Sequence, residues 1–350
     1  DNAYFDGSYF HNGEIVPAKG FCTDVFFQQA NAFITRCAQQ EKPFFAYIST
    51  NAPHKPLHCP PKYLAMYAGQ SDSIAAFYGM ITNIDDNVGT TRQLIKRLGI
   101  ADDTIFVFTT DNGTASGAKV YNAGMRAGKG SPYEGGHRVP FFVHWPAGGL
   151  TKQHDVDELT HAVDVVPTLL EMTGVKKPDG VEFDGVSIAD LLDPTKDVDW
   201  PKRFVITDSQ RVRDPIKWRS SSVMSRKYRL VNRKELYDIA SDPGQRNNIA
   251  ERHPEIVAEM REFYDEWWAD LEPSFQNATA IYLGHKGENP ARLTSHDWIT
   301  TGSTPWNQAH IRRATTGKKN TGFWNVKVVE DGDYEIRLRR WPEEADAAIN

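Results

Sequence analysis

A carboxylate and an amide stand side by side at Asp111 and Asn112, within the segment Thr-Thr-Asp-Asn-Gly at 109–113. The apolar run before it, 104–108, is typical of a strand buried on both faces, and ligands of open α/β sheets bind beyond the strand ends. Consecutive strand residues point to opposite faces, so both side chains can serve one ion only if the chain turns first, which Gly113 permits. Their oxygens suit Ca²⁺ or Mg²⁺. The alternative is an ordinary Asp-Asn-Gly loop turn.

A second candidate residue is Lys129, which lies between Gly128 and Gly130. Flanking glycines leave room for its ammonium group to approach an anion, although the spacing is not that of a phosphate-binding loop. Further along, Arg138 is a candidate for binding the same anion, or for holding Glu134 within the loop. For Lys129 the alternative is a solvated loop cation.

The third candidate is His54, in the segment Asn-Ala-Pro-His at 51–54 that follows the apolar run 43–50. A histidine in this place can donate a hydrogen bond to an anion or protonate a leaving oxygen. Nearby prolines exclude a helix, so His54 and His58 do not form a helical zinc-binding pair. The alternative is a loop imidazole packed on proline.

Taken in this order, these segments resemble the sulfatase family of the alkaline phosphatase superfamily. The resemblance covers roughly residues 1 to 270. Its motifs are Asn-Ala-Pro-His at 51–54, Thr-Asp-Asn-Gly at 110–113, Gly-Lys-Gly at 128–130, Tyr-Glu-Gly-Gly-x-Arg-Val-Pro at 133–140, and Glu-Leu-Tyr-Asp at 235–238 with Asp-Pro at 242–243 and Asn-Asn-Ile at 247–249. The resemblance implies that Asp111 and Asn112 bind Ca²⁺ and that Lys129 and His54 contact the sulfate and its bridging oxygen.

Several family features are absent from this sequence. Sulfatases carry, near their start, a pair of acidic metal ligands and a Cys/Ser-x-Pro/Ala-x-Arg motif whose first residue becomes formylglycine, and later a Gly-Lys-x-His segment. None of the three cysteines, Cys22, Cys37 and Cys59, has this context, and the pair at 85–86 lies within a predicted helix, where it would face solvent or another helix. We therefore expect a fragment of a bacterial sulfatase that lacks its N-terminal formylglycine segment and is inactive alone.

The resemblance predicts that the complete protein is a sulfuric ester hydrolase acting on sulfate esters, and it leaves sulfated carbohydrates open as substrates. One alternative is a phosphate or phosphonate ester hydrolase of the same superfamily. The identity of the catalytic nucleophile, which is absent from this sequence, would discriminate between these classes. Another is a non-catalytic fragment that binds sulfated glycans. By resemblance we expect the periplasm or the exterior of a bacterium. The sequence leaves the oligomeric state open.

Composition excludes several other classes. The 350 residues are 40% hydrophobic and 25% charged, as in ordinary globular proteins, and the net charge of −6 gives no reason to expect nucleic-acid binding. No apolar stretch approaches the ~18 residues of a membrane span. Three cysteines allow at most one disulfide.

Periodicity predicts the elements that would position these residues. Helices are expected at 24–40, with Asp24 as N-cap, at 72–98 and at 164–173, and strands at 43–50, 104–110 and 139–145. Their alternation indicates an α/β fold with a largely parallel central sheet flanked by helices. By the sulfatase resemblance, residues 1–200 would form the C-terminal part of the catalytic domain.

The rest of the chain changes in character. Strands are expected at 203–208, 217–224 and 227–232 and a helix at 254–270, so residues 201–272 predict a small antiparallel sheet with a helix packed on it. Residues 273–350 predict a β-rich appendage, with a hairpin of 323–329 and 334–341. The appendage would be a partial β-sandwich, because a complete one needs about seven strands.

Overall fold

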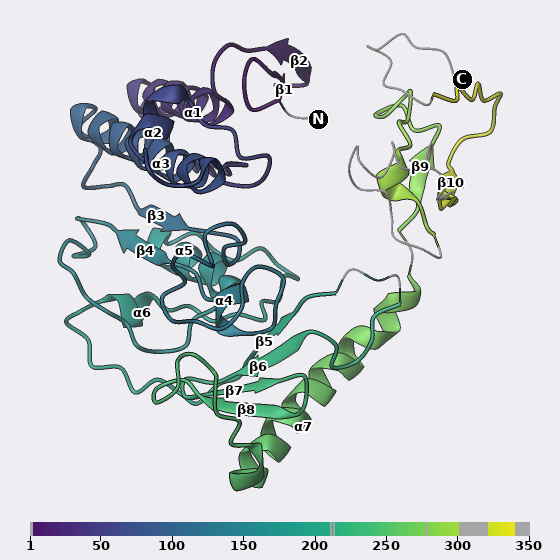
Figure 1. Ribbon diagram of the computed structural model, residues 1–350. Helices are drawn as coiled ribbons and strands as arrows, with labels where there is room; N and C mark the ends of the chain where they lie inside the picture. The colour runs from purple at the N-terminus through teal and green to yellow at the C-terminus, as the bar shows by residue number, and fades with distance from the viewer. Residues whose placement is uncertain (1–2, 211, 213, 278, 301–320, 340–350) are drawn as a thin grey trace. The chain divides into compact units, whose positions relative to one another are not determined.

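The computed structural model describes residues 3–210, 212, 214–277, 279–300 and 321–339 (Figure 1). The chain divides into two compact units, which are described separately. The first comprises Asp1–Gln210 and Lys217–Trp267, and the second comprises Arg211–Ile216 and Trp268–Asn350. Helices and several sheets together confirm the predicted α/β class. The predicted boundaries at 200 and 272 stay predictions.

The first unit opens with a two-stranded hairpin and three helices. These elements are β1 (Ser8–His11), β2 (Glu14–Pro17), α1 (Cys22–Gln39), α2 (Pro61–Ala65) and α3 (Asp72–Arg97). The predicted cap of α1 is wrong: Phe21 is the N-cap residue, and Asp24 lies in the first turn. Its carboxylate instead accepts hydrogen bonds from Asn83 at 2.7 Å and Asn87 at 2.8 Å, which tie α1 to α3.

Helix α3 also holds the short helix α2. The Tyr63 hydroxyl donates to the Asp86 carboxylate at 2.8 Å, so this member of the acidic pair serves helix packing. The C-terminal end of α3 matches the prediction, because Gly99 follows it in the left-handed region with φ 73°.

A small apolar core connects these helices to the segment that carries His54. Its buried members are Tyr4, Phe21, Cys22, Ala52 and Met80. Ala52 belongs to the Asn-Ala-Pro-His segment, and Cys22 and Met80 lie in α1 and α3. The His54 segment is therefore anchored by apolar packing although His54 itself is exposed.

Two strands stand where the central sheet was predicted. β3 (Phe106–Thr109) and β4 (Phe141–His144) form an antiparallel pair, in which Phe106 is opposite His144 and Thr109 is opposite Phe141. The parallel direction predicted for these two segments is wrong, and residues 43–50 form no strand. An apolar run indicates extended backbone, but neither its direction nor its partner is encoded in the run.

Short helices follow these strands. They are α4 (Glu134–His137), the 3₁₀ turn η1 (Ala162–Asp164), α5 (Val165–Thr173) and α6 (Ala189–Leu192). Helix α5 confirms the prediction at 164–173 and ends at Gly174, whose φ is 68°. Asp164 is the N-cap residue of α5, but its side chain makes no capping hydrogen bond there. Its carboxylate instead accepts from the amide of His161, the N-cap residue of η1, and Arg203 donates to both of its oxygens at 2.9 Å.

The small antiparallel sheet is confirmed. It contains β5 (Val205–Asp208), β6 (Ser221–Met224), β7 (Tyr228–Val231) and β8 (Glu235–Asp238), in that order, and is followed by η2 (Ala250–Arg252) and α7 (Pro254–Leu271). Helix α7 runs along this sheet (Figure 1). Tyr264, fully buried in α7, stacks on Trp218 with ring centroids 3.7 Å apart and donates to Asp208 at 2.8 Å.

The second unit has η3 (Glu272–Gln276), β9 (Ile281–Leu283), η4 (Ser295–Asp297) and β10 (Val326–Val328). The predicted hairpin is wrong, because β10 pairs in parallel with β9. Residues 334–339 form no strand, and 340–341 lie outside the described residues. Alternation in sequence reports a strand with two unlike faces but does not select its partner. In the described parts of both units, no helix is long and apolar enough to cross a bilayer.

Candidate active site

Asp111 and Asn112 lie just beyond the end of a strand, as their proposed use requires. β3 ends at Thr109, and the chain bends at both residues. The Asn112 side-chain amide donates to the Asp111 carboxylate, so the two side chains touch. The chain has therefore left the strand before these residues, which allows both side chains to face one ligand.

Glycine backbones join this turn to a second loop. The Gly113 amide donates to the Gly136 carbonyl at 3.0 Å. A β-carbon on Gly113 would overlap the Gly135 carbonyl oxygen, and one on Gly136 would overlap the Ser131 carbonyl. The two loops meet backbone to backbone, which only glycine permits at these positions.

Lys129 belongs to that second loop and is hydrogen bonded to the same turn. Its amide donates to the Thr114 carbonyl at 3.0 Å. The neighbouring Gly128 approaches so closely that a β-carbon there would lie 2.6 Å from the Thr114 oxygen. The structure thus brings together the segment of Asp111 and Asn112 and the segment of Lys129. These segments are separate in the sequence, so folding is needed to place them side by side.

Glu134 is the buried charge of this region, with a side chain 1% exposed. Arg229 donates to it at 2.6 Å, and His137 lies 3.1 Å away. Burial would raise the pKa of Glu134, but the His137 hydrogen bond and the Arg229 charge outweigh it and bring the pKa to about 2. Arg138 is 3.6 Å from Glu134 and 59% exposed, so it remains accessible to an anion.

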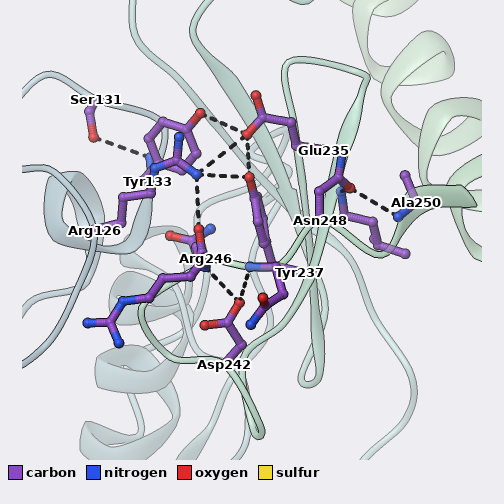
Figure 2. A network of polar contacts seen from close by, with 12 residues as sticks. Arg126, Ser131, Tyr133, Glu235, Tyr237, Asp242, Arg246, Asn248 and Ala250 are labelled. Atoms are coloured by element: carbon purple, nitrogen blue, oxygen red, sulfur yellow. Dashed lines mark hydrogen bonds and ion pairs between the residues drawn. The ribbon is translucent and has the colours of Figure 1, made fainter.

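Arg126 connects the loop to the small sheet (Figure 2). It donates to the Tyr237 hydroxyl and to the Gln245 carbonyl, both at 2.9 Å. Its guanidinium lies 3.9 Å from the ring centroid of Tyr133. The hydroxyls of both tyrosines donate to Glu235. A charged and aromatic network therefore holds one side of the Lys129 loop.

His54 is held by another set of contacts. The Tyr4 hydroxyl donates to the carbonyls of Asn51, at 3.1 Å, and His54. His54 Nδ1 lies 2.7 Å from the Lys55 carbonyl, which can only accept, so Nδ1 carries the proton and Nε2 remains for a ligand. Among the described residues, no hydrogen bond or ion pair joins His54 to Asp111, Asn112 or Lys129.

A hard cation fits the donor type at Asp111 and Asn112. Ca²⁺ takes six to eight oxygen ligands, and these two side chains would supply two of them. Within the described part of the chain, no group of three or more His, Cys, Asp or Glu side chains could hold a metal. The two residues therefore fit part of a Ca²⁺ site, and further ligands would have to come from other groups.

Sequence reasoning missed the residues that support these loops. Arg229 is the closest partner of Glu134, and Arg126, Tyr237 and Gln245 fix the loop from the other side. The motif at 235–238 contains Tyr237, but nothing in the sequence indicates that Tyr237 contacts the distant Arg126. Tyr4 likewise lies 50 residues from His54.

Family models cover most of the first unit. Residues 3–175 match the model described as Sulfatase. Residues 128–267 match the model described as N-sulphoglucosamine sulphohydrolase, C-terminal. The two matches overlap at the loop that contains Lys129 and Arg138.

Curated relatives agree with these matches. The Escherichia coli protein named Uncharacterized sulfatase YdeN is 28% identical over 75% of this chain and 54% of its own length. The N-acetylgalactosamine-6-O-sulfatase of Bacteroides thetaiotaomicron is 27% identical over 69% of this chain and 50% of its own length. The chain spans about half the length of these relatives.

Solved structures show the same fold. Ps i-CgsB in complex with k-i-k-neocarrahexaose is 26% identical and has a TM-score of 0.64, over 73% of this chain and 57% of that chain. With the helices and sheets described above, the matching family models and relatives lead to one assignment. The chain belongs to the sulfatase family.

Proposed function

We propose that the complete protein hydrolyses sulfate esters and that this chain supplies the metal-binding turn and the anion-binding lysine. The supporting observation is the hydrogen bond from the Lys129 amide to Thr114, which follows Asp111 and Asn112 closely in the chain. A cationic side chain and two hard oxygen donors on adjoining loops suit a small tetrahedral anion.

In this proposal each charged group has a separate task. Ca²⁺ bound by Asp111 and Asn112 would neutralise charge on the ester, with Mg²⁺ as the less favoured ion. Lys129 contacts a sulfate oxygen and stabilises the negative charge that develops on it. Arg138, exposed and only loosely paired with Glu134, binds the outer part of the anion.

His54 acts on the leaving group. When the bond between sulfur and the bridging oxygen breaks, that oxygen gains an electron pair and takes a proton from Nε2 of His54, which enters this step doubly protonated and leaves it with only the Nδ1 proton that the Lys55 carbonyl holds. The attacking group is proposed to be a formylglycine hydrate, as the family membership suggests. Cys22, Cys37 and Cys59 lack the sequence context for that modification, so none of them is assigned this role.

We infer sulfated carbohydrates as the substrate class. The support is the printed name of the Bacteroides thetaiotaomicron relative, an N-acetylgalactosamine-6-O-sulfatase, and the neocarrahexaose bound by Ps i-CgsB. We also propose that the complete protein works in the periplasm or outside a bacterial cell. Fractionation of cells that produce the full-length protein tests this location.

The experiment compares hydrolysis of a chromogenic aryl sulfate and the matching aryl phosphate by the full-length protein. Lys129→Ala should lower kcat for the sulfate roughly 10²–10³-fold. His54→Ala should lower it roughly 10²-fold or more, and less for a substrate whose leaving group needs no proton. The matched control is Lys119→Ala, an exposed lysine of the same region, which should keep the wild-type rate.

Three outcomes would contradict the proposal. Wild-type kcat in both Lys129→Ala and His54→Ala would remove their assigned roles. Preference for the phosphate would instead indicate a phosphate ester hydrolase of the same superfamily. Glycan binding without any hydrolysis would indicate a binding protein.

A further inference from the structure

The loop that carries Lys129 is closed at its base. The Gly135 amide donates to the Arg126 carbonyl at 2.9 Å, so the segment from 126 to 135 returns on itself. A β-carbon on Gly135 would lie 2.5 Å from that same carbonyl oxygen, so the closure leaves no room for a side chain. Lys129 lies within the closed segment, and its position depends on what fixes the two ends.

The first end is fixed by Arg126 (Figure 2). One nitrogen of its guanidinium donates both to the Tyr237 hydroxyl and to the Gln245 carbonyl. The same group lies 3.7 Å from the Glu235 carboxylate. Tyr237 is 2% exposed and Gln245 is fully buried, so Arg126 bonds to residues that are themselves packed against the small sheet.

The second end is fixed by Tyr133 and Glu134. The Tyr133 hydroxyl donates to Glu235 at 2.9 Å, and the Glu134 amide donates to the Gln245 side-chain oxygen at 2.8 Å. The Glu134 carboxylate pairs with Arg229. Both ends therefore use a common set of partners.

These partners all belong to the small sheet or to the turn after it. Arg229 lies in β7, Glu235 and Tyr237 lie in β8, and Gln245 follows β8. Between its two ends the loop contains no strand or helix apart from the start of α4. The two ends of the loop are consequently held by the sheet rather than by local secondary structure, and the hydrogen bond from the Lys129 amide to Thr114 holds its middle.

We propose that the small sheet positions Lys129, and that Arg126 and Tyr237 are positioning residues for sulfate-ester hydrolysis. This inference rests on the anion-binding role of Lys129 proposed above. An ammonium group stabilises a reacting anion only when it is held in the productive geometry, and a displacement of about 1 Å can cost 10²-fold in rate. Arg126 and Tyr237 do not touch the substrate in this proposal, and they act through the loop.

The experiment uses the full-length protein with two loop variants and one control. Arg126→Met removes both hydrogen bonds but keeps most of the side-chain stem, and Tyr237→Phe removes one hydroxyl without changing the ring. Arg226→Met is the control, because Arg226 lies between β6 and β7 and pairs with Glu158 at 2.5 Å outside this network. Aryl sulfate hydrolysis and hydrogen–deuterium exchange of residues 126–136 are measured for each.

We expect Arg126→Met to lower kcat/KM by up to roughly 10²-fold, Tyr237→Phe to lower it less, and Arg226→Met to leave it unchanged. Amide exchange in 126–136 should accelerate in the same order. In a Lys129→Ala background, Arg126→Met should cause little further loss, because its effect passes through the lysine.

Failure of this inference can be distinguished from failure of the proposed function. Unchanged exchange and turnover in both Arg126→Met and Tyr237→Phe would overturn the positioning role alone. An equal loss with and without Lys129 would also overturn it, since a general structural defect is additive. Wild-type turnover in Lys129→Ala would overturn the proposed function and the positioning role with it.

Discussion

The loop of Lys129 and the segment of His54 are held in place by different kinds of contact. Around Lys129, glycine backbones touch directly, and the buried pair of Glu134 and Arg229 joins the loop to the small sheet. The His54 segment is held by the Tyr4 hydroxyl and by Ala52 within a small apolar core. One region depends on charge and on the absence of side chains, and the other depends on apolar packing.

This difference shows where each region is vulnerable. Removing one partner of a buried ion pair strongly destabilises the fold, because the other charge stays buried and unpaired. Backbone contacts between glycines do not tolerate an added methyl group. An apolar core with a few hydroxyl contacts responds weakly to pH and to removal of one hydroxyl. Mutations and pH changes can therefore separate the two regions.

The largest expected effect is that of Arg229→Ala. It leaves the buried Glu134 carboxylate without its closest cation, so the free energy of unfolding should fall by about 3–5 kcal/mol. Urea denaturation measures this. The control is Lys202→Ala, which breaks the pair with Glu259 that is exposed on both sides and should change stability by less than about 1 kcal/mol. Similar losses in the two variants would show that the buried pair has no special weight.

Acid should weaken the Lys129 loop selectively. The pKa of Glu134 is lowered from 4.5 to about 2, so its contribution is present above the unfolded-state pKa and is lost as pH falls from about 4.5 toward 2. The shift corresponds to about 3 kcal/mol of unfolding free energy. Denaturation curves recorded across this pH range should show this loss of stability in the wild-type protein and not in Glu134→Gln. An unaltered pH dependence would contradict the assignment.

A methyl group at Gly113 should strain the contact between the two loops. Gly113→Ala places a β-carbon against the Gly135 carbonyl, and we expect a loss of about 1–3 kcal/mol by thermal unfolding. Gly89→Ala is the control, because α3 has open space there and the substitution should be neutral or stabilising by up to about 1 kcal/mol. Equal stability of the two variants would mean that the loops separate without cost.

The smallest effect is expected in the His54 segment. Tyr4→Phe removes the hydroxyl that donates to the Asn51 and His54 carbonyls but keeps the buried ring, so stability should fall by about 1 kcal/mol. Tyr47→Phe, at a ring that is 82% exposed, should have no measurable effect. Chemical denaturation compares them. A loss as large as that of Arg229→Ala would remove the contrast between the two regions.

Local signals in the sequence were sufficient for the parts that depend on neighbouring residues. The spacing of apolar residues predicted α3 close to its observed bounds, and the helix predicted at 254–270 matches α7. Short strand-like runs predicted three strands of the small sheet but missed the fourth, β8. The turn at Asp111 and Asn112 was predicted because the strand before it and Gly113 after it are adjacent in the chain. Motifs at fixed spacing also identified the sulfatase family.

Partnerships between distant residues were decided only by the tertiary structure. The antiparallel direction of β3 and β4, the parallel pairing of β9 and β10, and the choice of Arg229 as partner of Glu134 have no local signal. A strand run is compatible with either direction, and a buried carboxylate with any cation that reaches it. The cation that pairs with Glu134 is decided when the whole chain folds, because the contact joins segments about a hundred residues apart.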